Sequence, residues 1–127
     1  ELSPSIIATN AMAKEFIEKA HNIIEENLDN PQFDVNDFAK QMAMGRSILF
    51  SKVKGMTGQT PNELITNVRL KKAGRMLKEN PDLSITEISY KVGFSSSSYF
   101  IKKFHEFYNQ TPAGFRKQIY GSGTDKK

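Results

Sequence analysis

Apolar residues recur every three or four positions along almost the whole chain, which is the spacing of an amphipathic α-helix. No run alternates between apolar and polar residues in the way that a half-buried strand does. The pattern therefore predicts an all-α protein of about seven helices. They are expected over residues 11–28, 35–43, 46–57, 61–79, 85–93 and 97–108, and from Pro112 onward.

Residues that favour helix ends mark several of these boundaries. Asp34 is expected to cap the helix that starts at residue 35. Thr60-Pro61 supplies a cap and a first-turn proline for residues 61–79. Ser84 and Glu87 have the spacing of a capping box. Inside residues 46–57, the side chains expected to face the core are Ile48, Leu49, Val53 and Met56.

The chain contains an internal repeat. Residues 35–61 and 85–112 align helix for helix, at an offset of 50 that becomes 51 after one extra residue in the second turn. The two copies close on GQTP and NQTP, where Gly58 and Asn109 are the residue types that best tolerate a left-handed helix end. The repeated unit is a short helix, a tight turn and a second helix, which is the helix-turn-helix motif.

The repeat suggests how the chain is organised. We expect a flexible lead-in over residues 1–10 and a first helix-turn-helix subdomain over residues 11–60. A linker helix over residues 61–79 then leads to a second such subdomain over residues 80–120. A flexible tail is expected over residues 121–127.

Charge is distributed unevenly along the chain, although its net value is only +4. Residues 1–37 hold two bases against eight acids, whereas residues 38–78 hold nine bases against Glu63 alone. So basic a block favours a polyanionic partner or an acidic neighbour. The alternative is a solvated helix face that the acidic first helix partly neutralises. One of the bases, Arg69, is expected to be partly structural and to tie the two subdomains together.

In a helix-turn-helix, the second helix leaves one face free to enter the major groove of DNA. If Leu49, Val53, Phe100 and Phe104 are buried, hydroxyl, aromatic and cationic side chains occupy the free faces. Such groups bind base edges, thymine methyls and phosphates. The candidate base contacts are Arg46, Ser47, Phe50, Ser51, Ser98, Tyr99 and Lys102, and the candidate phosphate contacts are Lys52, Lys54, Ser96, Ser97 and Lys103. The alternative is that Ser97 caps a helix and that Phe50 and Tyr99 cover core edges.

Other classes of function find little support in the sequence. There is no cysteine, the two histidines lie on separate predicted helices, and no nucleotide-binding or metalloprotease motif is present. We therefore expect no catalytic residue, no metal and no cofactor. A helical module that docks an acidic protein partner is the main alternative. RNA binding is less favoured because the aromatic residues lie at core spacing.

Two segments of the chain are FAKQMAMGRSILFSKVKGMTGQTPNELITNVRLKKAGRMLKE (38–79) and LSITEISYKVGFSSSSYFIKKFHEFYNQTPAGFR (83–116). Both resemble the DNA-binding domain of AraC/XylS-type transcription regulators. The resemblance implies two helix-turn-helix subdomains joined by a long helix, with both recognition helices in successive major-groove segments of double-stranded DNA. The lead-in before residue 38 also resembles the C-terminal output module of hybrid two-component sensors, which implies an upstream receiver or sensor region.

This resemblance sets further expectations. RNA polymerase is an expected partner, the isolated domain is expected to be monomeric, and its compartment is expected to be the cytoplasm, with a membrane-anchored parent left open. The chain departs from the family pattern in Gly45, where serine commonly opens the first recognition helix, and in Ser96-Ser97 of the second turn. His105 stands where lysine is frequent, and Tyr108 and Phe115 exchange the usual phenylalanine and tyrosine.

Overall fold

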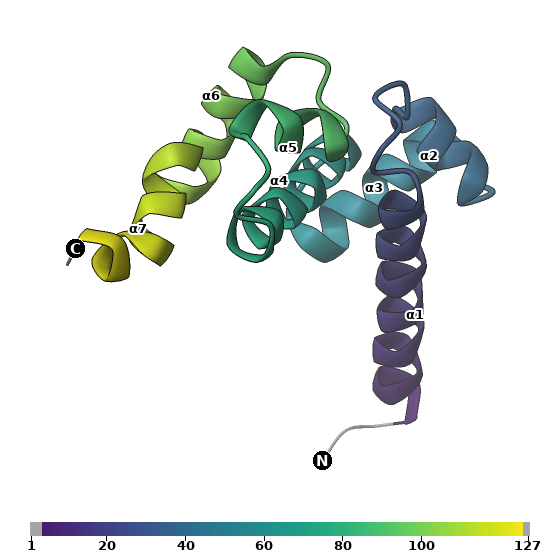
Figure 1. The fold of residues 1–127 in the computed structure, drawn as a ribbon. Coiled ribbons are helices and arrows are strands. Elements are labelled where there is room, and N and C mark those ends of the chain that lie inside the picture. The colour runs from purple at the N-terminus through teal and green to yellow at the C-terminus, as the bar shows by residue number, and fades with distance from the viewer. Residues whose placement is uncertain (1–3, 126–127) are drawn as a thin grey trace. The chain divides into compact units, whose positions relative to one another are not determined.

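The computed structural model describes residues 4–125, with side chains for residues 9–121. This part of the chain forms helices joined by short turns, and it contains no strand (Figure 1). The predicted all-α class is thus confirmed. The helices are α1 (Pro4–Glu26), α2 (Val35–Gln41), α3 (Arg46–Thr57), α4 (Pro61–Glu79), α5 (Ile85–Lys91), α6 (Ser97–Tyr108) and α7 (Pro112–Asp125).

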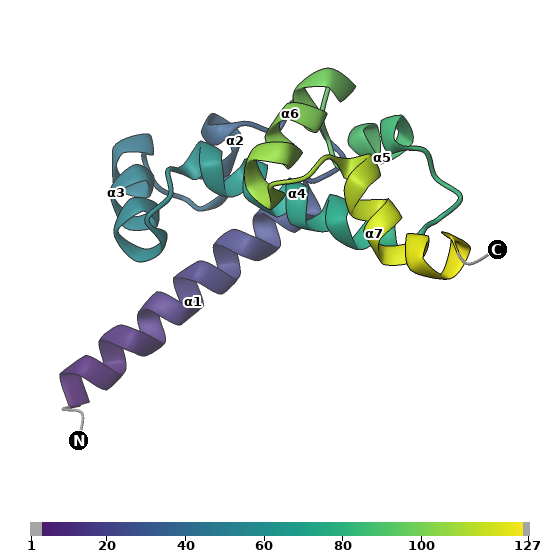
Figure 2. The ribbon, with the colours of Figure 1, turned by 90° about the vertical axis from the view of Figure 1, so that its left-hand side faces the viewer.

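The two ends of the described chain are more helical than the sequence suggested. Helix α1 begins at Pro4 and runs without interruption, so residues 4–10, for which a flexible lead-in was predicted, are helical (Figure 2). Proline fits a first helical turn because its missing N–H would have no partner there. Helix α7 continues to Asp125 through Gly121 and Gly123. Glycine lowers helix propensity but does not end a helix as proline does. The expected flexibility of residues 1–3, 126 and 127 lies outside the described residues.

Contacts divide the chain into two compact units. The first unit comprises Glu1–Asn27 and Phe33–Ile65, and the second comprises Leu28–Gln32 and Thr66–Lys127. The boundary lies inside α4, so the helix expected to be a separate linker contributes to both units. Its C-terminal part belongs to the second unit because Leu70 and Leu77 are buried in that unit's core.

In the first unit, α1, α2 and α3 pack against one another. Ile24, Phe38, Leu49 and Val53 are fully buried and form the centre of its core. Asp34 caps α2 as expected, and it forms a reciprocal capping box with Asp37. The first helix-turn-helix therefore has both a local start signal and an apolar core.

The second unit has an aromatic core. The Phe104 ring lies 5.6 Å from that of Phe100, 4.5 Å from that of Tyr108 and 5.4 Å from that of Phe115, measured between ring centroids. Ser84 and Glu87 form the predicted capping box at the start of α5. Its hydrogen bonds to the Glu87 carboxylate lower the pKa of that group.

Arg69 is a buried cation in the second unit, which confirms a structural role, while its expected tie between the subdomains stays a prediction. Its guanidinium donates hydrogen bonds to the carbonyl oxygens of Leu28, Asn30 and Val92. Burial lowers the pKa of Arg69, although an arginine remains charged in proteins. Gly93 makes this approach possible, because a Cβ at that position would overlap the guanidinium and the Leu28 carbonyl.

The two copies of the repeat have matching backbones at their turns. Ala43 and Gly93, 50 residues apart, both have positive φ in the turn before the second helix. Gly58 and Asn109, 51 residues apart, end α3 and α6 in the left-handed region, as predicted. The sequence repeat is therefore a structural repeat of the helix-turn-helix.

Candidate nucleic-acid interface

The second helix of the first repeat, α3, exposes a polar and aromatic face. Leu49 and Val53 turn toward the core, and Arg46, Ser47, Phe50 and Ser51 are all exposed. The Phe50 side chain keeps 48% of its surface accessible. It lines a shallow concavity of the first unit with Val35, Arg46, Ser47 and Pro61.

The start of α3 differs from that of its counterpart. Gly45 is the N-cap of α3, and it makes no side-chain hydrogen bond. In α6 the Ser96 hydroxyl accepts a hydrogen bond from the Tyr99 N–H at 3.2 Å. The cap of α6 is thus Ser96, and the alternative that Ser97 caps this helix is wrong by one residue. A serine hydroxyl has one donor and two acceptor sites, so Ser96 can still donate to a phosphate oxygen while it accepts from Tyr99.

The exposed face of α6 holds the second group of candidates. Ser98, Tyr99 and Lys102 are exposed, and Ser97 is half-buried. The Tyr99 ring keeps 50% of its surface accessible and lies 6.2 Å from the Phe94 ring. The Lys103 ammonium lies 5.8 Å from the centre of the Tyr99 ring. One side of the Tyr99 ring therefore packs against Phe94, and the other side is accessible to solvent.

The three candidate phosphate-binding lysines have contacts within their own units. The Lys52 ammonium lies 5.8 Å above the Phe16 ring, and Lys54 donates to the Gly58 carbonyl at 3.2 Å. Lys103 pairs with the Glu106 carboxylate at 3.1 Å. Solvent-exposed contacts of this kind are worth about 1 kcal/mol or less. A phosphate can therefore displace them at little cost.

Two exposed isoleucines on these helices were not among the candidates. Ile48 was expected to face the core, but 54% of its surface is accessible, and Met56 is exposed as well. The reason is geometric: a short helix packs through a narrow seam, which Leu49 and Val53 already fill. Ile101 of α6 is 39% accessible. The repeat alignment could have predicted that Ile48 is exposed, because Ile48 aligns with Tyr99, which was expected on the exposed face of its helix.

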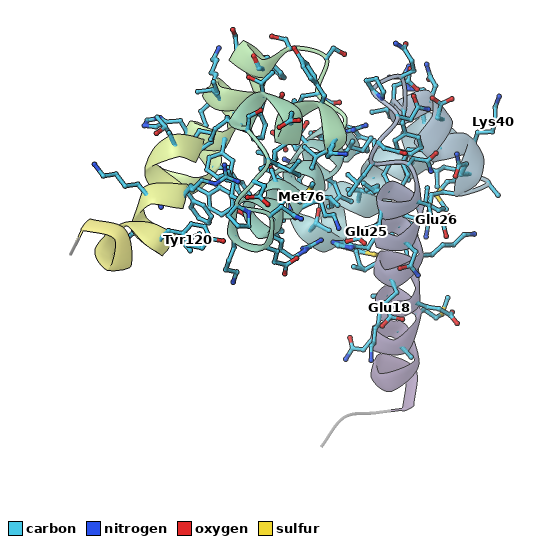
Figure 3. The ribbon with its side chains drawn as sticks, in the orientation of Figure 1. Glu18, Glu25, Glu26, Lys40, Met76 and Tyr120 are labelled. Atoms are coloured by element: carbon cyan, nitrogen blue, oxygen red, sulfur yellow. The ribbon has the colours of Figure 1, made fainter. Side chains whose placement is uncertain are left out.

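Charged side chains outside the two proposed recognition helices follow the pattern seen in the sequence. Glu18, Glu25 and Glu26 are exposed along α1, and Lys40 extends from α2 (Figure 3). In residues 4–125 no three histidine, cysteine, aspartate or glutamate side chains converge as ligands of a metal ion would. None of the described helices has the length and apolar character to cross a membrane.

The chain has clear similarity to known proteins. Residues 38–118 match the model of a family described as a helix-turn-helix domain. Over 117 residues the chain is 39% identical to the histidine kinase P4 of Formosa agariphila. This match covers 92% of this chain and 8% of that protein. The chain is also 37% identical to the Msm operon regulatory protein of Streptococcus mutans over 111 residues. This second match covers 87% of this chain and 39% of that protein. The chain thus corresponds to a minor part of these curated relatives.

A solved structure with the same fold comes from Chromobacterium violaceum, a transcriptional regulator described as AraC-type. It has a TM-score of 0.77 and 26% identity, and the match covers 86% of this chain and 96% of that one.

Proposed function

Because the chain belongs to the AraC-type helix-turn-helix domain family, we propose that it binds double-stranded DNA in a sequence-specific manner and regulates transcription. One observation carries the proposal. In both copies of the repeat, the second helix buries two apolar side chains and exposes hydroxyl, aromatic and cationic groups. An α-helix fits the major groove, and these groups suit its base edges and flanking phosphates.

Each unit is proposed to read its own half-site. Arg46, Ser47, Phe50 and Ser51 of α3 contact bases in one, and Ser98, Tyr99 and Lys102 of α6 contact bases in the other. Lys52, Lys54, Ser96, Ser97 and Lys103 bind phosphates. The half-sites occupy successive major-groove segments, about 10–10.5 bp apart. The two exposed faces differ in sequence, so the site need not be a palindrome.

We also infer the setting in which the domain works. It acts as the output module of a larger regulator, downstream of a receiver or sensor region, because the chain matches only a small part of a histidine kinase. RNA polymerase is the proposed protein partner, the cytoplasm the proposed compartment, and the isolated domain is proposed to be monomeric. The proposed activity is binding alone, with no catalytic step.

The first experiment is a selection of bound duplexes from a random library, followed by affinity measurements over a range of salt concentrations. The affinity is expected to fall steeply with salt, because each phosphate contact releases counterions. Lys54→Ala is expected to weaken all duplexes about equally and to reduce the salt slope by about one. The matched control is Lys40→Ala on α2. Failure to select any sequence, or an affinity that ignores salt, would contradict DNA binding and favour an acidic protein partner.

A second experiment tests the use of both half-sites. Inserting about five base pairs between them turns one onto the opposite side of the duplex. We expect the affinity to fall to that of one unit plus non-specific contacts. Unchanged affinity would show that only one copy reads DNA.

A further inference from the structure

The two proposed recognition helices share an arrangement of exposed apolar side chains. The third residue of each helix is Ile48 in α3 and Tyr99 in α6, and the fifth is Phe50 in α3 and Ile101 in α6. All four side chains are among the exposed large apolar residues of the protein. Each helix thus presents one aliphatic and one aromatic side chain at the same two positions, in opposite order.

These two positions lie on the flanks of the face that is free to meet DNA. At about 100° per residue, the third and fifth residues of a helix stand about 160° apart, on either side of its second and sixth residues. The second and sixth residues are Ser47 and Ser51 in α3, and Ser98 and Lys102 in α6. A polar centre is therefore bordered by an apolar side chain on each side, in both copies.

The chemistry of isoleucine limits what it can recognise in a DNA groove. It has no hydrogen-bonding group, and the apolar feature that the major groove offers is the C5 methyl of thymine. A single exposed isoleucine on a protein surface needs no explanation. Here, however, an isoleucine recurs on the flank of each proposed recognition helix, outside the buried seam.

We propose that Ile48 and Ile101 are specificity-determining residues, each of which contacts the C5 methyl of one thymine, Ile48 in one half-site and Ile101 in the other. The proposal rests on the proposed function, which supplies the groove. Because the order of aliphatic and aromatic residues is reversed between the helices, the thymines read by isoleucine lie on opposite flanks of their respective helices.

The test removes single methyl groups from the DNA. In the duplex of highest affinity from the selection, each thymine is replaced in turn by deoxyuridine, which keeps base pairing and the O4 acceptor. We expect at least one thymine in each half-site to show a loss of about fourfold in affinity, the factor that corresponds to burying one methyl group. Ile48→Ala should abolish this loss at one thymine only, and Ile101→Ala at one thymine of the other half-site.

Matched controls separate methyl recognition from general effects. Ile119→Ala on α7 removes an isoleucine of similar exposure, 37% against 39% for Ile101, and Met12→Ala removes an exposed apolar side chain of the first unit. Both should leave every deoxyuridine effect unchanged. All four positions are exposed, so the variants should fold, which circular dichroism checks.

The outcomes distinguish the two proposals. If a preferred sequence is selected but the deoxyuridine losses are absent, or persist unchanged in Ile48→Ala and Ile101→Ala, the methyl contacts are refuted and DNA binding stands. If only one variant abolishes a loss, the assignment of the other isoleucine is refuted. If no sequence is preferred over random DNA, the proposed function itself fails.

Discussion

Replacing Arg69 by methionine removes the donor that holds together three carbonyl groups of the second unit. The guanidinium binds the carbonyls of Leu28 and Asn30, which precede α2, and that of Val92, which ends α5. Methionine fills a similar volume but donates no hydrogen bond. The Leu28 and Val92 bonds are buried, so solvent does not readily replace the lost donor.

The expected cost follows from these contacts. A buried acceptor left without a partner costs about 1–3 kcal/mol, and two such groups are created. The substitution also removes the penalty for burying the charge, which is visible in the lowered pKa of Arg69 and offsets part of this cost. We expect a net loss of about 3 kcal/mol in the free energy of unfolding. At about 2 kcal/mol per molar urea, the unfolding midpoint of this unit falls by about 1.5 M.

Tyrosine fluorescence provides the signal for measuring the urea unfolding of the second unit. The chain has no tryptophan, and all four tyrosines (Tyr90, Tyr99, Tyr108 and Tyr120) belong to the second unit, so tyrosine emission during urea unfolding reports on that unit. The control is Lys71→Met, which replaces an exposed base on the same helix. A shift for Arg69→Met no larger than that of the control would refute the reasoning that these three bonds stabilise the unit.

Three further predictions test the fold and the interface. Gly93→Ala should destabilise the second unit at least as much as Arg69→Met, because the new Cβ overlaps the guanidinium and the backbone has a φ of +95°. Gly58→Ala, which meets no atom within 4 Å, is the milder control, and equal urea midpoints for the two glycine variants would contradict this. Burial raises the pKa of Tyr108 above its ordinary value of 10.0. The contribution of the protonated Tyr108 to stability is therefore fully present below pH 10.0 and is lost as the pH rises through the raised value. Tyr108→Phe should reduce this decline in unfolding followed by circular dichroism between about pH 8 and about pH 11, and an identical decline would show that Tyr108 is not its source. Ser47→Ala should cost about 1–3 kcal/mol of base discrimination in one half-site. Affinities for a panel of single-base variants check this, and equal relaxation of both half-sites would be inconsistent with it.

Helix positions and most helix ends could be predicted from the sequence, because the signals that set them are local. Asp34 and Ser84 cap their helices with side chains that reach only three residues along the chain. Gly58 and Asn109 end theirs because these residue types tolerate a left-handed backbone. The repeat then predicted which helices form equivalent pairs.

Much of the candidate site could also be predicted, since exposure on a helix follows from which neighbours are apolar. Arg46, Ser47, Ser98 and Lys102 are exposed as expected, and their contacts with DNA stay predictions. The periodicity failed for Ile48, whose hydrophobicity suggested burial.

Only the tertiary structure decided features that depend on distant parts of the chain. Whether Ile48 is buried depends on how wide a seam α3 shares with α1 and α2, and Leu49 and Val53 fill that seam. The sequence indicated that Arg69 is partly structural but could not name its acceptors, which lie 41, 39 and 23 residues away. Local sequence thus determined the helices and most of their ends, through interactions that span one helical turn. Packing determined which side chains remain exposed at the proposed DNA interface, because burial depends on neighbours that only the folded chain brings together.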